Sequence, residues 1–105
     1  MSLDATIARA RELFEGLPGL AHRKMFGGAG LYAEGRIFAL IADGEIYLKA
    51  KGAFADDLAA EGSEPFVYDG RNRPVAMGYW RLPEGAHDAP DEALGLARRA
   101  LDESA

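Results

Sequence analysis

Residues 36–50, RIFALIADGEIYLKA, decide the fold of this 105-residue chain, because they contain its clearest β-hairpin pattern. Two runs rich in apolar residues flank Asp43-Gly44, a dipeptide typical of two-residue hairpin turns. Such a turn fixes the register between the two strands. It pairs Ala42 with Glu45, Ile41 with Ile46, Leu40 with Tyr47, Ala39 with Leu48 and Phe38 with Lys49.

Side-chain alternation divides this predicted hairpin into two faces. The first face carries Ile37, Ala39, Ile41, Ile46, Leu48 and Ala50, which suit a core. The second face carries Phe38, Leu40, Ala42, Glu45, Tyr47 and Lys49. Because the second face is partly apolar and aromatic, it is typical either of an association surface or of a place where the terminal helix lies.

The ten residues RKMFGGAGLY, from Arg23 to Tyr32, are the most unusual upstream stretch. Gly27, Gly28 and Gly30 predict a bulge or corner beside a strand, because glycine tolerates sharp bends and close approach. A phosphate-binding loop is the alternative. It is disfavoured because the Gly-Lys-Ser/Thr ending is absent and a strand follows instead of a helix. Glu34-Gly35 then predicts either another tight turn or a longer loop.

The remaining elements are predicted from the spacing of apolar residues and from the capping and turn residues between them. Apolar residues at helical spacing predict helices over residues 3–17, 53–60 and from about residue 90 onward, with Ser2 or Asp4 capping the first. Residues 65–68 and 74–82 predict a second hairpin, in which Tyr79 and Trp80 point to opposite faces. We therefore predict an α+β fold, an antiparallel β-sheet with helices packed mainly on one face.

Composition limits the possible functions. A chain of 105 residues predicts a single domain, and the absence of cysteine excludes disulfides and thiolate chemistry. No signal peptide or long apolar run is evident, so we expect a cytoplasmic protein without a membrane segment. A net charge of −5 opposes general binding to nucleic acid. The alternative is a local basic patch made by Arg23, Lys24, Lys49, Lys51, Arg71 and Arg73.

Catalytic and metal-binding patterns are missing from the sequence. The two histidines, His22 and His87, are far apart and lack further ligands at metal-binding spacing. The few serine and threonine hydroxyls stand in no activated motif. We therefore expect no enzyme activity, no metal and no cofactor. A small-ligand site or enzyme pocket near the glycine segment is the least supported alternative.

Four segments, taken together in this order, resemble the N-terminal domain of the TfoX/Sxy family. They are residues 23–32, residues 46–49 (Ile-Tyr-Leu-Lys), residues 62–66 (Gly-Ser-Glu-Pro-Phe) and residues 78–83 (Gly-Tyr-Trp-Arg-Leu-Pro). The resemblance implies a secretion-chaperone-like fold with the order helix, three strands, helix, two strands, helix. It also implies a role in regulating competence genes and DNA uptake alongside the cyclic-AMP receptor protein, without enzyme activity. Full-length regulators carry a further helical domain, so we expect a stand-alone N-terminal domain here.

The sequence thus predicts a small non-enzymatic regulatory module that binds a protein partner. The candidate partner-binding residues are Arg23, Lys24, Phe38, Leu40, Tyr47 and Lys49. The candidate partners are a second copy of the chain, forming a homodimer, or a transcription factor such as the cyclic-AMP receptor protein. Direct nucleic-acid binding through the basic patch is the alternative function.

Overall fold

Two tight turns organise the first part of the sheet in the computed structural model, which describes residues 2–25, 27–69 and 74–103. Asp43 and Gly44 have φ angles of 51° and 77°, and Glu34 and Gly35 have φ angles of 50° and 82°. Positive φ at both central residues is the hairpin geometry that matches strand twist. Glu34 tolerates it while its backbone N–H donates to the Gly19 carbonyl at 3.2 Å. Both connections are therefore two-residue turns.

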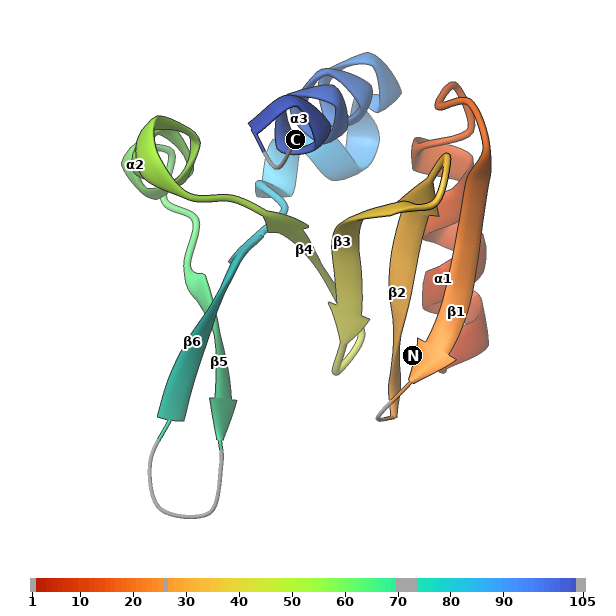
Figure 1. Cartoon of the computed structure of the whole chain (residues 1–105), viewed down its shortest axis with the longest axis horizontal. Coiled ribbons are helices and arrows are strands. Elements are labelled where there is room, and N and C mark those ends of the chain that lie inside the picture. Colours follow the sequence, from red (N-terminus) through yellow and green to blue (C-terminus); the bar gives the residue numbers. More distant parts are fainter. Residues whose placement is uncertain (1, 26, 70–73, 104–105) are drawn as a thin grey trace.

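The structure contains three α-helices, a short 3₁₀ helix and six strands in the described residues (Figure 1). In chain order these are α1 (Leu3–Leu13), β1 (Leu20–Met25), β2 (Gly28–Ala33), β3 (Arg36–Ala42), β4 (Glu45–Lys49), α2 (Gly52–Ala60), β5 (Pro65–Asp69), β6 (Pro74–Arg81), η1 (Glu84–Asp88) and α3 (Pro90–Glu103). The predicted α+β class and element order are confirmed, with β1 as one further strand before α2.

The six strands form one antiparallel sheet in the order β1-β2-β3-β4-β6-β5. Helices α1 and α3 both contact β3 and β4, and α2 contacts α3. The helices thus share one face, as predicted, and the core lies between them and the sheet. In Figure 1 the β5–β6 hairpin projects away from the helices at lower left. No helix among the described residues is long and apolar enough to cross a membrane.

Local sequence explains how α1 begins. Ser2 stands in extended conformation before the helix, and its hydroxyl accepts a hydrogen bond from the Ala5 N–H at 3.1 Å. This bond satisfies one of the N–H groups that a helix N-terminus leaves without an internal partner. Of the two predicted capping residues, Ser2 is therefore the one that caps.

The β3–β4 register agrees with the prediction from Ala42–Glu45 through Ala39–Leu48. The prediction for the next residues was wrong, because β3 contains a bulge. Strand β2 pairs Leu31 with Ala39 but Tyr32 with Ile37, so Phe38 is the extra residue. An extra residue interrupts the alternation of side chains. Phe38 and Ala39 consequently both enter the core, and each is 0% exposed.

The bulge corrects the predicted positions of two side chains. Phe38 was placed on the second face of the hairpin, but its ring packs edge-to-face against Phe14, with centroids 5.2 Å apart. Ile37 was placed in the core, but it is only half-buried and lies with Met25 and Tyr32 around the α-carbon of Gly30. Ile37 therefore replaces Phe38 on the sheet face away from the helices.

Candidate binding surface

The sheet face opposite the helices is the main candidate site. We call it the open face, and cross-strand pairing and side-chain contacts define it. Its members are Arg23, Met25, Gly30, Tyr32, Ile37, Leu40, Glu45, Tyr47, Lys49, Phe66, Tyr79 and Arg81. Its large apolar and aromatic side chains are half-buried, whereas most of those on the helix side are buried. The open face therefore keeps apolar surface in contact with water.

Aromatic rings form the part of the open face over β4, β5 and β6. The rings of Tyr47 and Phe66 meet with centroids 4.9 Å apart and an interplanar angle of 62°. Partial burial, and then the nearby Glu45, raise the pKa of Tyr47. Burial, and then Tyr32, raise the pKa of Tyr79. Both phenols stay neutral at physiological pH, so they contribute apolar ring surface and a hydroxyl that can donate or accept.

Four charged side chains belong to the open face: Arg23, Glu45, Lys49 and Arg81. Arg81 forms an ion pair with Glu45 at 3.2 Å, which neutralises both groups. The guanidinium of Arg23 lies over the Tyr32 ring, 6.0 Å from its centroid. Neither Arg23 nor Lys49 has a carboxylate partner among the described residues. The open face thus presents two uncompensated cations in a chain whose net charge is −5.

The structure does not bring all the predicted cations together. Arg23 pairs with Gly30 and Lys24 with Ala29, so these neighbours point to opposite faces of β1. Lys24 instead contacts Asp4, with 2.7 Å between Nζ and Oδ1, and this contact lowers the pKa of Asp4. Two other members of the predicted patch, Arg71 and Arg73, lie outside the described residues. Of the six predicted partner-binding residues, the open face holds Arg23, Leu40, Tyr47 and Lys49.

The three predicted corner glycines have different roles. Gly27 has a φ of 78° in the connection between β1 and β2, as a corner requires. Gly28 and Gly30 lie within β2 itself. A Cβ on Gly28 would stand 2.1 Å from the Ile41 carbonyl oxygen, and one on Gly30 would stand 2.9 Å from Cε of Met25. These two glycines permit close packing, and they form no phosphate cradle.

Apart from Gly30, seven open-face residues were not predicted as binding residues: Met25, Tyr32, Ile37, Glu45, Phe66, Tyr79 and Arg81. Ile37 carried no signal, because the bulge cannot be read from alternation. The opposite orientation of Tyr79 and Trp80 was predicted and is confirmed. Tyr79 pairs with Lys49 on the open face, while Trp80 pairs with Leu48 and packs against the core.

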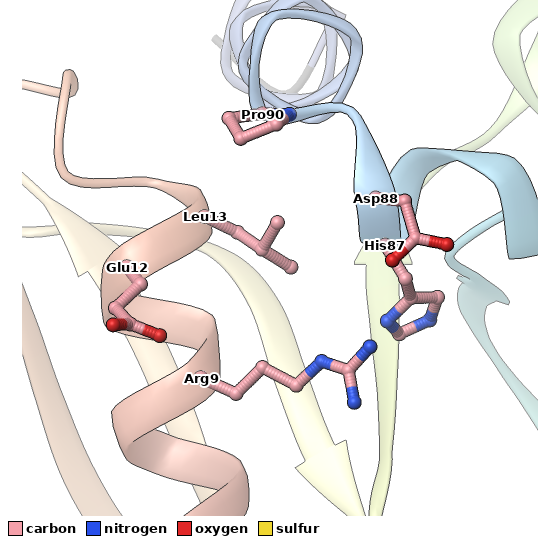
Figure 2. A pocket seen from close by; sticks show the side chains of 6 residues that line it. All are labelled: Arg9, Glu12, Leu13, His87, Asp88 and Pro90. Carbon is pink, nitrogen blue, oxygen red and sulfur yellow. The ribbon is translucent and has the colours of Figure 1, made fainter.

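A groove lies between α1 and η1, on the helix side of the molecule (Figure 2). This groove has a volume of about 360 Å³ and is lined by Arg9, Glu12, Leu13, His87, Asp88 and Pro90. Burial, and then the positive charge of Arg9, lower the pKa of His87, against the opposing effects of Glu45, Glu84 and Asp88. Within the described residues, no cluster of histidine and carboxylate side chains could hold a metal ion.

Comparison with known proteins identifies the family. Residues 12–104 match the TfoX N-terminal domain. The chain belongs to this family. Two curated relatives agree: the "DNA transformation protein TfoX1" of Aliivibrio fischeri is 28% identical over 78% of this chain, and "Protein Sxy" of Escherichia coli is 26% identical over 91%. The matched regions span only 39% and 46% of those relatives, so the chain covers less than half their length.

The four segments that carry the resemblance serve both sides of this TfoX N-terminal domain. Strand β4 sends Leu48 into the core and Tyr47 to the open face. The end of β6 likewise places Tyr79 on the open face, and Leu82 just beyond it is buried. The segment around residue 63 is tied to β6, because the Ser63 hydroxyl donates to the Arg81 carbonyl at 2.6 Å. These segments therefore both hold the sheet together and build the open face.

Proposed function

We propose that this TfoX N-terminal domain is a non-enzymatic regulatory module that binds another protein through its open face. The name of the Aliivibrio relative connects the family with DNA transformation. On this basis we place the module in the control of DNA transformation, acting on transcription through its partner. Because the chain covers less than half of each relative, this role is a proposal for the domain alone.

The observation that supports this proposal best is the composition of the open face. Tyr47, Tyr79 and Phe66 bring aromatic surface, and Leu40 and Ile37 bring aliphatic surface. Tyrosine and arginine are enriched among the residues that contribute most to protein–protein binding, and apolar patches on monomers mark interaction sites. A surface of this composition favours a protein partner.

The charges on the open face specify the partner further. Arg23 and Lys49 lack carboxylates of their own among the described residues. A matching surface would place apolar side chains between the cations and carboxylates against them. Such pairing at the rim of an interface increases the association rate and the specificity. We therefore propose a partner with an apolar segment flanked by Asp or Glu.

Nucleic acid is the less favoured partner. Of the cations predicted to contact phosphate, Lys24 is already paired with Asp4. Arg81, a further cation on the open face, is likewise paired with Glu45. The net charge of −5 adds long-range repulsion of phosphates. Duplex and single-stranded DNA nevertheless belong among the test ligands, because exposed aromatic rings can stack on bases.

The test compares Tyr47→Glu with a control variant, Ala53→Glu. The first change puts a carboxylate at the centre of the open face, while the second adds the same charge at the exposed start of α2, where helices favour it. Sedimentation velocity first determines whether the wild-type chain is a dimer. Calorimetry then measures binding to the cyclic-AMP receptor protein, the partner suggested by the family resemblance, and anisotropy measures binding to DNA.

The expected result is one protein ligand, either a second copy or the receptor protein, whose affinity falls at least tenfold in Tyr47→Glu and is unchanged in Ala53→Glu. Far-ultraviolet circular dichroism should show both variants folded. The proposal fails if Tyr47→Glu binds each protein ligand as the wild type does. It also fails if DNA alone binds and Tyr47→Glu weakens that binding, because the open face would then be a nucleic-acid surface.

A further inference from the structure

Strand β1 leaves one side of its backbone without a partner strand. It is the outermost strand at its end of the sheet, with α1 behind it (Figure 1). The Glu34 N–H donates to the Gly19 carbonyl at 3.2 Å, and the next pair in this register is Leu20 with Ala33. Hydrogen-bonded pairs alternate with non-hydrogen-bonded pairs in an antiparallel ladder, so every second residue after Gly19 bonds to β2. These inward residues are Ala21, Arg23 and Met25, and the outward residues between them are Leu20, His22 and Lys24.

The outward residues offer an edge to which another strand can bind. Their backbone N–H and carbonyl groups make no hydrogen bond to another part of the described chain. The middle of β1 is exposed. The opposite edge strand, β5, begins with Pro65, which has no N–H to donate. Extended peptides bind to free edges by adding a strand, and main-chain hydrogen bonds then supply the affinity.

Cations lie on both sides of the β1 edge. On the open-face side, Arg23 has no carboxylate partner among the described residues. On the helix side, Arg11 of α1 donates to Nδ1 of His22 at 3.2 Å, and it too makes no ion pair in the part of the chain that is described. Lys24 is paired with Asp4, so these two charges largely cancel. The edge thus presents an uncompensated arginine toward each face of the sheet.

These charges determine what kind of strand fits the edge. Neighbouring residues of an added strand point to opposite faces, so two adjacent carboxylates would meet Arg23 and Arg11 separately. A second copy of β1 fits less well, because antiparallel pairing would bring Arg23 and Lys24 close to the same cations of the other copy. Charged side chains on edge strands prevent such self-pairing in many proteins. The edge therefore favours an acidic strand.

We propose that β1 binds an acidic, extended segment of another protein by strand addition, with Arg23 and Arg11 each facing one of two adjacent carboxylates. The segment would form a further strand of the sheet, beside β1. This proposal goes beyond the function proposed for the open face, because the affinity comes from backbone groups at the sheet edge. Tyr47→Glu separates the two sites, since Tyr47 lies on β4, and β2 and β3 stand between β4 and β1.

Amide hydrogen exchange of the full chain, measured by nuclear magnetic resonance, tests strand addition directly. The probe is the blocked peptide Thr-Val-Glu-Asp-Val-Thr, which is as long as β1. Comparison peptides carry Gln-Asn or Lys-Lys in place of Glu-Asp. Without peptide, the outward amides should exchange quickly and the inward amides slowly, because only the inward amides are bonded to β2. Saturation with the acidic peptide should slow exchange of the outward amides about tenfold or more and leave the inward amides unchanged.

Fluorescence anisotropy with the labelled acidic peptide compares variants. His22→Pro removes an outward N–H at an edge position that tolerates proline, and it should abolish binding, whereas His22→Ala keeps the N–H and should still bind. Arg11→Gln and Arg23→Gln should each weaken binding about threefold, as expected for an exposed ion pair. Arg98→Gln, at an exposed position on α3, and Tyr47→Glu should bind as the wild type does. The Gln-Asn peptide should bind more weakly than the acidic one, and the Lys-Lys peptide should not bind.

Several results would overturn the proposal. One is unchanged exchange of the outward amides at millimolar acidic peptide, and another is equally tight binding of the Lys-Lys peptide. Loss of peptide binding in Tyr47→Glu would place the peptide on the open face instead. Outward amides that are already protected in a chain that sediments as a dimer would show that a second copy occupies the edge. The open-face proposal is judged separately, by the effect of Tyr47→Glu on its own protein ligand.

Discussion

Truncating two neighbouring side chains on β3 would test the bulge that shapes both faces of the sheet. Phe38 is 0% exposed and packs against Phe14, whereas Ile37 is half-buried on the open face. Without the bulge, alternation would give the opposite result, with Ile37 in the core and Phe38 outside. A strand with the bulge and a strand without it therefore predict different losses in the free energy of unfolding for Phe38→Ala and Ile37→Ala.

The magnitudes follow from burial. Replacing a fully buried phenylalanine by alanine costs about 3–5 kcal/mol, which includes the cavity that the missing ring leaves. Ile37→Ala removes three carbons that are only half-buried, which at about 0.8 kcal/mol per buried methylene comes to about 1 kcal/mol. The difference between the two variants should thus be at least about 2 kcal/mol.

Urea unfolding followed by the fluorescence of Trp80 is the assay. With a slope of about 1–3 kcal/mol per molar urea, Phe38→Ala should lower the midpoint by about 2 M, and Ile37→Ala by well under 1 M. If Phe38→Ala is too unstable to measure, Phe38→Leu supplies a milder version of the same comparison. Equal losses, or a larger loss in Ile37→Ala, would refute the bulge and the description of the open face that depends on it.

Three further predictions concern other parts of the chain. Gly28→Ala should destabilise the fold by more than about 2 kcal/mol in the same urea assay, because its Cβ would stand 2.1 Å from the Ile41 carbonyl oxygen; a neutral result would contradict this packing. Ser2→Ala should cost about 1 kcal/mol through loss of the α1 cap, and thermal unfolding would detect a fall of several degrees. Below pH 6.5 the unfolded chain binds more protons at His87 than the folded chain does, since folding lowers that pKa. The free energy of unfolding should therefore decrease as the pH is lowered through this range, and it should decrease less steeply in His87→Gln.

Local sequence signals predicted much of the sheet correctly. Asp43-Gly44 defined a two-residue turn, and that turn fixed the register from Ala42–Glu45 to Ala39–Leu48. These features depend on residues close together in the chain, whose conformational preferences are set by backbone geometry. The same reasoning gave Ser2 as one of two capping candidates and predicted the opposite orientations of Tyr79 and Trp80.

The composition of the open face was only partly predictable. Leu40, Tyr47 and Lys49 were placed correctly because no bulge separates them from the turn between β3 and β4. Phe38 was misplaced because strict alternation assumes that each residue has one partner, and β2 skips one residue of β3. Arg23 and Lys24 were grouped because they are adjacent in sequence, although adjacent strand residues face opposite ways.

The sequence by itself determined the element order, the main hairpin and the apolar character of one sheet face, because each follows from local turn chemistry and side-chain periodicity. Only the tertiary structure decided that Phe38 is buried against Phe14 while Ile37 is turned outward, since the bulge arises from pairing with β2. It also decided that Arg9 and His87, 78 positions apart by number, line one groove. Contacts between distant segments depend on how the helices pack on the sheet, which local preferences do not encode.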